Sequence, residues 1–136
     1  MKPWVVVHPT DGVAYVRSSW PDVVVADHGI AVASAEATRR AARLRSEVLP
    51  FARAIAALAA SHPTAAPDAT WLACTVQACV AVPSLCTEAM AGTLRAVAAL
   101  AHAAADASRS ASHNQRARIH DAIEATCRLA AEVCVS

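Results

Sequence analysis

Apolar residues recur at alternating intervals of four and three along three stretches of this chain. The members are Ala37, Ala41, Leu44, Val48, Phe51, Ile55 and Leu58, then Leu72, Val76, Cys79, Pro83, Cys86 and Met90, then Ile119, Ile123, Thr126, Ala130 and Val133. This spacing places each set on one stripe of an α-helix, and such a stripe is stable only when it is buried against another. The pattern predicts a mainly α fold, an antiparallel bundle of three long helices over about residues 30–61, 70–108 and 112–134.

Two prolines fall inside the helical pattern, and each should kink or divide its helix. Pro50 removes the bond to the Ser46 carbonyl, and Pro83 removes the bond to the Cys79 carbonyl. A turn in the linker 62–67 would bring both prolines to one level, where a cavity or partner groove is expected. Its lining would be Leu44, Val48, Phe51, Cys79 and Met90, with Glu47 as a polar contact. The alternative is an ordinary core in which Ser84 or Thr87, together with water, satisfies the freed carbonyls.

Residues 1–31 differ in composition from the rest of the chain. Two short β-branched runs, 4–8 and 13–17, flank the turn sequence Pro9-Thr10-Asp11-Gly12, which predicts a β-hairpin. Residues 19–29 fit either a short helix, which we favour, or a third strand. We expect one domain over residues 1–136, with the helical bundle in 32–136.

Alanine is abundant and aromatic residues make up only 4% of the chain, so the core should consist of small side chains. Such helices bury little area, and a second copy of the chain would supply more. We therefore expect a homodimer. The net charge of +1 argues against nucleic-acid binding.

The first residues lack the apolar block of a signal peptide, because only three valines precede His8-Pro9. Gln77, Pro83 and Glu88 interrupt the longest apolar stretch, so no membrane span is expected. These features favour a soluble, cytoplasmic protein whose five cysteines are thiols.

The cysteines form two pairs with the same spacing. Cys79 and Cys86 are seven residues apart, as are Cys127 and Cys134. On a continuous helix this spacing separates the members of a pair by about 10.5 Å. A turn near residue 111 would bring Cys86 close to Cys134, as a thiol pair, a disulfide or part of a soft-metal site. Since no CxxC or CxxxC motif occurs, the sequence favours cysteines that act as small apolar core residues.

Two histidines give a second candidate site. The same turn sets His102 opposite His120, and an acid follows each four residues later, Asp106 and Glu124. These four side chains could bind a divalent metal between facing helices. Surface hydrogen bonds between neighbouring helical residues are the alternative.

Residues 116–121, Arg-Ala-Arg-Ile-His-Asp, resemble the phospho-accepting helix of sensor histidine kinases. The resemblance implies that His120 would accept a phosphoryl group in a phosphotransfer module. No glycine-rich phosphate loop, G-x-S-x-G or H-E-x-x-H motif is present, which argues against an enzyme.

The sequence thus favours a non-enzymatic interaction module, an adaptor, regulator or inhibitor that binds itself and a protein partner through apolar helical faces. The alternative is a bundle that binds a small molecule or a divalent metal. No other cofactor is expected.

Overall fold

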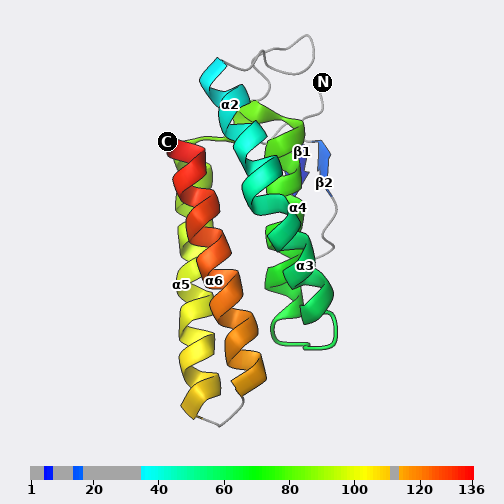
Figure 1. The fold of residues 1–136 in the computed structure, drawn as a ribbon, viewed down its shortest axis with the longest axis vertical. Helices are drawn as coiled ribbons and strands as arrows, with labels where there is room; N and C mark the ends of the chain where they lie inside the picture. Colours follow the sequence, from blue (N-terminus) through cyan, green and yellow to red (C-terminus); the bar gives the residue numbers. More distant parts are fainter. Residues whose placement is uncertain (1–4, 8–13, 17–34, 111–113) are drawn as a thin grey trace.

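The chain is mainly α, as the sequence predicts (Figure 1). The computed structural model describes residues 5–7, 14–16, 35–110 and 114–136. Within them, helix α2 (Ala35–Arg43), the π-helix η1 (Leu44–Val48) and helix α3 (Leu49–Ala59) follow one another without a break. Then come α4 (Ala66–Ala81), the 3₁₀ helix η2 (Pro83–Leu85), α5 (Glu88–Ser110) and α6 (Asn114–Val135). The described part is therefore an up-and-down bundle of four helical columns, one more than the three predicted helices, because the second of these is divided at Pro83.

The chain passes Pro50 without ending the helix. The backbone N–H of Leu49 donates to the carbonyl of Leu44, which widens the turn directly before the proline. Pro50 has no N–H for the carbonyl of Ser46, and its ring would crowd that carbonyl in a regular α-helix. A π-turn relieves both problems, so the predicted kink at Pro50 takes the form of a wide turn.

The π-turn changes which residues of the first column face the core. Up to the end of this turn, the predicted stripe is buried at Ala37, Ala41, Leu44 and Val48. After it, Leu49, Ala52, Ile55 and Ala59 are buried, whereas Phe51 and Leu58 are 63% and 66% exposed. A wide turn holds more residues per turn, and the stripe therefore shifts by about one position. The prediction that Phe51 and Leu58 belong to the core is wrong.

Pro83 divides the second predicted helix into α4 and α5. Val82 leaves the helical region with φ −129° and ψ 86°, because a residue before proline avoids the α conformation. Helix α4 ends at Ala81, and after η2 the hydroxyl of Thr87 accepts a hydrogen bond from the backbone N–H of Met90 at 3.1 Å. This bond caps the N-terminus of α5.

The N-terminal part is described only at two short strands. Strand β1 (Val5–Val7) pairs antiparallel with β2 (Ala14–Val16), with Val6 opposite Tyr15. The predicted turn at Pro9–Gly12, the ambiguous residues 19–29 and the predicted helix start at Ser112 lie outside the described residues.

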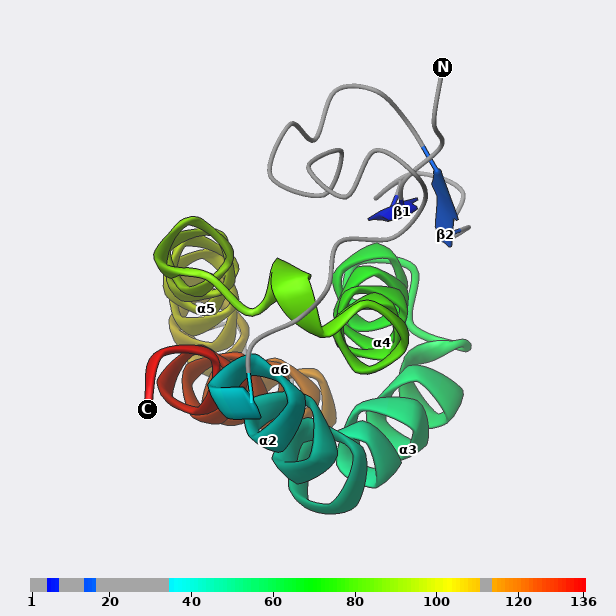
Figure 2. The same ribbon diagram turned by 90° about the horizontal axis from the view of Figure 1, so that it is seen from above.

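Helix α6 is the centre of the bundle. It lies beside α5 along most of its length and also contacts α2, α3 and α4 (Figures 1 and 2). Small residues line the α5–α6 contact, among them Ala98, Ala101, Ala105 and Ala130, all fully buried. None of the described helices combines the length and apolar character needed to cross a membrane.

Candidate metal centre

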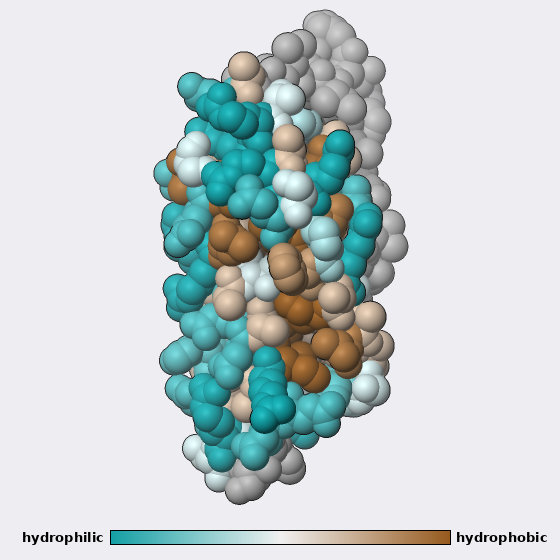
Figure 3. All heavy atoms as spheres, viewed as in Figure 1, coloured by the Kyte–Doolittle hydropathy of each residue, from teal (hydrophilic) through white to brown (hydrophobic). Residues whose placement is uncertain are grey.

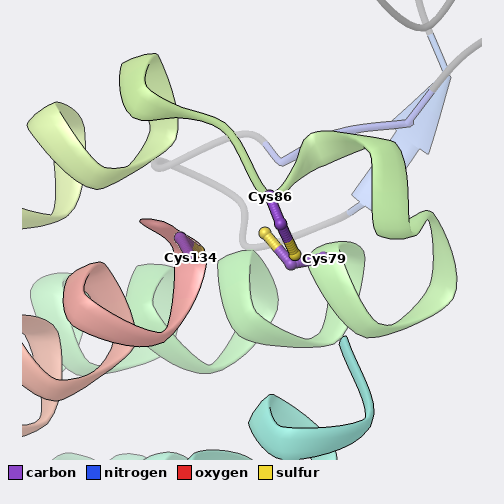
Figure 4. A group of neighbouring side chains, drawn as sticks. All are labelled: Cys79, Cys86 and Cys134. Carbon is purple, nitrogen blue, oxygen red and sulfur yellow. The ribbon is translucent and has the colours of Figure 1, made fainter. Parts of the chain in front are cut away.

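Three cysteines from three different elements meet at one end of the bundle. Cys79 lies near the end of α4, Cys86 directly follows η2, and Cys134 lies in the last turn of α6 (Figure 4). Their sulfur atoms all lie within 4.8 Å of one another. Each side chain is at most 4% exposed, and none of the three forms a disulfide.

The break at Pro83 brings Cys79 and Cys86 together. On a continuous helix their separation would be about 10.5 Å, the value that their spacing predicts. Because α4 ends at Ala81 and the chain turns through η2, Cys86 returns toward Cys79 instead. The predicted distance for this pair is therefore wrong, whereas the predicted approach of Cys86 to Cys134 is confirmed.

The three sulfurs differ in their acid–base properties. The thiols of Cys134 and Cys79 hydrogen-bond to the sulfur of Cys86, and together with the charge of Arg40 they lower the pKa of Cys86 to about 4. Cys79 hydrogen-bonds to Cys134 and to Cys86, and these two bonds together with burial raise the pKa of Cys79 well above its ordinary value. For Cys134, the bond to Cys79 lowers the pKa, but the bond to Cys86 and burial outweigh it and raise the pKa to about 12. The directions of these pKa shifts make Cys86 the first of the three cysteines to lose its proton.

Two arginines of α2 connect that helix to the residues beside Cys134. Arg40 Nε donates to the carbonyl oxygen of Ser136 at 3.2 Å, and Arg43 Nη1 donates to the Ser136 hydroxyl at 3.0 Å. The cluster therefore has a positively charged side chain on its α2 side. Arg43 also pairs with Glu47 at 2.9 Å, which lowers the pKa of Glu47 through that hydrogen bond.

Sulfur is a soft donor, and the spacing of the three atoms suits a single soft ion. Ligands at about 2.3 Å from an ion in their own plane lie roughly 4 Å from one another. The observed separations need to shrink by less than about 1 Å to reach that arrangement. No histidine or carboxylate of the described residues joins the three sulfurs.

The residues predicted to line a groove are divided between core and surface. Leu44, Val48, Cys79 and Met90 belong to the buried core cluster. Phe51 and Glu47 are exposed at the surface. Only Cys79 of this set belongs to the thiol cluster.

The predicted histidine and carboxylate site is brought together only in part. His102 Nδ1 lies 3.2 Å from Glu124, and His102 Nε2 lies 3.4 Å from Asp106. The two carboxylates thus bind opposite sides of one exposed ring. Two arginines complete this chain of surface ion pairs. Arg109 lies 2.7 Å from Asp106, and Arg128 lies 3.0 Å from Glu124.

His120 does not join the other three residues. Its side chain is only 2% exposed, and its Nδ1 has no hydrogen-bond partner within the described part of the chain. Burial lowers the pKa of His120, although Asp68 acts in the opposite direction. A phosphoryl donor cannot reach a side chain that is buried to this extent, so the structure gives no support to phosphotransfer.

The sequence pattern did not predict that Cys79 joins Cys86 and Cys134. The signal for this contact is Pro83, which stands between Cys79 and Cys86 and prevents one helix from separating them. A proline between two cysteines seven residues apart therefore indicates that their sulfurs can meet.

Comparison of the chain with protein-family models, with curated proteins and with solved structures gives no match. Because a helical bundle supports many functions, the function has to be inferred from the chemistry of the site.

Proposed function

We propose that this protein binds a soft metal ion through Cys79, Cys86 and Cys134. The observation that carries the proposal is the convergence of three buried sulfur atoms within 4.8 Å of one another. Sulfur ligands select soft ions such as copper(I), zinc(II) and cadmium(II) over magnesium or calcium. The role is one of binding, and the proposal includes no enzymatic step.

A fourth cysteine of the core shows how the cluster differs from ordinary core packing. Cys127 is fully buried on α6. This burial is the main reason why the pKa of its thiol is raised to about 12. It behaves as a small apolar side chain, as the sequence favours for all the cysteines. Cys86 has the opposite electrostatic environment, because two thiols and Arg40 stabilise its anion. Metal ligands need to be deprotonated, so the lowered pKa of Cys86 favours metal binding there, whereas Cys79 and Cys134 would lose their protons to the incoming ion.

Metal binding by thiolates requires reduced cysteines, and the proposal therefore includes the reducing cytoplasmic location expected from the sequence.

Cadmium(II) titration of the full chain, followed by the near-ultraviolet absorption of cadmium–thiolate bonds, tests the proposal. Wild-type protein should bind one ion per chain. Cys79→Ser, Cys86→Ser and Cys134→Ser should each lose most of this absorption. Cys127→Ser is the matched control, since it removes a buried cysteine of the same helix as Cys134, and it should bind like wild type. Equal binding by all four variants, or no binding by folded wild-type protein, would contradict the proposal.

We also propose that the protein self-associates through α3, the interaction role that the sequence favours. Phe51 and Leu58 are large apolar side chains seven residues apart on one exposed stripe, and apolar residues gather over α3 on this face (Figure 3). If Phe51 of one copy meets Leu58 of another in an antiparallel contact, twofold symmetry repeats the same contact between Leu58 and Phe51. A second copy of the chain is thus a self-complementary occupant for this stripe.

Sedimentation velocity over a range of concentrations tests the self-association. Wild-type protein should form a dimer, and Phe51→Glu should shift it to monomer. Leu100→Glu on α5 is the control, because it charges an equally exposed leucine elsewhere and should leave the dimer intact. A wild-type monomer at every concentration would contradict this proposal.

A further inference from the structure

We infer that the ion at the cysteine cluster is copper(I), held by the sulfur atoms of Cys79, Cys86 and Cys134 alone. This inference rests on the proposed metal binding and names the ion. The number of donors is the property that decides between the soft metals. Zinc(II) takes four ligands in nearly all structural sites, whereas thiolate donors in smaller numbers suit copper(I).

No histidine, carboxylate or further cysteine supplies a fourth ligand in the part of the chain that the structure describes. The fourth buried cysteine, Cys127, lies two helical turns before Cys134. His102, the histidine that contacts two carboxylates, belongs to a separate surface chain of ion pairs.

Water is also a poor fourth ligand at this place. Each cysteine is at most 4% exposed, and all three belong to the buried hydrophobic core of the bundle. A catalytic zinc site has three protein ligands but keeps its fourth position open to solvent. This cluster is closed, which favours an ion that is satisfied by three sulfurs.

Charge alone would favour a divalent ion, because three thiolates leave one more negative charge around copper(I) than around zinc(II). Arg40 reduces this difference, because its side chain brings a positive charge to the same end of the bundle. Coordination number therefore outweighs charge.

The backbone also allows the sulfurs to approach one ion. Cys79 and Cys134 are fixed on helices, but Cys86 follows η2 outside a regular helix, with φ −74° and ψ 84°. A shift of less than about 1 Å can thus come from Cys86 without unwinding a helix.

Competition for metal under anaerobic conditions tests the inference on wild-type protein. Full-length protein is equilibrated with copper(I) and a chromophoric copper(I) chelator, and separately with zinc(II) and a chromophoric zinc(II) chelator. The protein should remove a stoichiometric amount of copper(I) from the copper(I) chelator. It should leave zinc(II) bound to the zinc(II) chelator. The copper X-ray absorption spectrum should then fit three sulfur ligands in one shell, without nitrogen or oxygen.

The outcomes separate the two proposals. Stoichiometric zinc(II) uptake at the expense of its chelator, with a four-coordinate absorption spectrum, would overturn the choice of copper(I) while leaving soft-metal binding intact. Failure to take up copper(I), zinc(II) or cadmium(II) would overturn both. Cys134→Ser should lose copper(I) retention and Cys127→Ser should keep it, and retention by Cys134→Ser would also overturn the three-sulfur site.

Discussion

Two cysteines on α6 show how neighbours decide the chemistry of one side-chain type. Cys127 and Cys134 lie on one face of the same helix and are both buried. Cys134 meets the sulfurs of Cys79 and Cys86, whereas Cys127 belongs to no such group among the described residues. Spacing along α6 treats the two residues alike, so the difference arises from what α4 and the segment after η2 place opposite each of them.

His120 is the residue whose burial has the clearest consequence for stability. Burial lowers its pKa below the ordinary value of 6.5, so the folded protein disfavours the protonated ring. The unfolded chain binds the proton below about pH 6.5, and stability should therefore fall as the pH decreases from 7.5 to 5. Urea unfolding at the two pH values measures this loss.

The variant His120→Leu should lose much of that pH dependence, because it removes the ring that titrates. The substitution breaks no hydrogen bond of Nδ1, which has no partner in the described part of the chain. His102→Gln changes an exposed histidine and serves as the control that keeps the dependence. A pH dependence of the same size in His120→Leu and wild type would show that His120 is not its source.

The two prolines act differently on the elements that contain them. The helix absorbs Pro50 with a π-turn, whereas Pro83 ends α4. Helical periodicity predicts that both residues disturb a helix, but it does not distinguish a wide turn from a break. Periodicity does predict which residues of α4 and α6 are buried. It does not predict that Phe51 is exposed, because this depends on how one turn of the helix accommodates the missing N–H of Pro50.

Replacement of Pro83 tests the link between the break and the thiol cluster. In Pro83→Ala the helix can continue beyond Ala81, which would carry Cys86 toward a position about 10.5 Å from Cys79. We expect metal affinity to fall at least tenfold, a loss typical of a change that disturbs ligand orientation, in a protein that remains folded. Pro50→Ala is the matched control and should keep wild-type metal affinity, with equal or higher stability.

The start of α5 depends on one side-chain cap. Thr87→Ala removes the acceptor for the Met90 N–H and should lower the free energy of unfolding by about 1 kcal/mol. Thr87→Ser retains a hydroxyl and should lose much less. Urea unfolding curves compare the two variants, and an equal loss in both would show that the hydroxyl bond is not the stabilising contact.

At the scale of the whole molecule, α6 connects the parts of the fold and carries one wall of the site. It contacts α2, α3, α4 and α5, and its last turn supplies Cys134. Pairing of α5 with α6 across a short turn is predictable from the sequence, and with it the approach of Cys86 to Cys134. The contacts of Arg40 and Arg43 with Ser136 join segments far apart in sequence, so no local pattern reveals them. The place of the third sulfur, that of Cys79, depends on how the chain turns after Pro83.

The central claim is that the three sulfurs form one metal site, and native mass spectrometry tests it most directly. Full-length protein and Cys134→Ala are each equilibrated anaerobically with copper(I) in the presence of a competing chelator and then freed of chelator. Wild-type protein should carry one copper ion per chain, and the variant should carry none while keeping the helical content of wild type. Folded wild-type protein without copper, or the same copper content in both proteins, would contradict the claim.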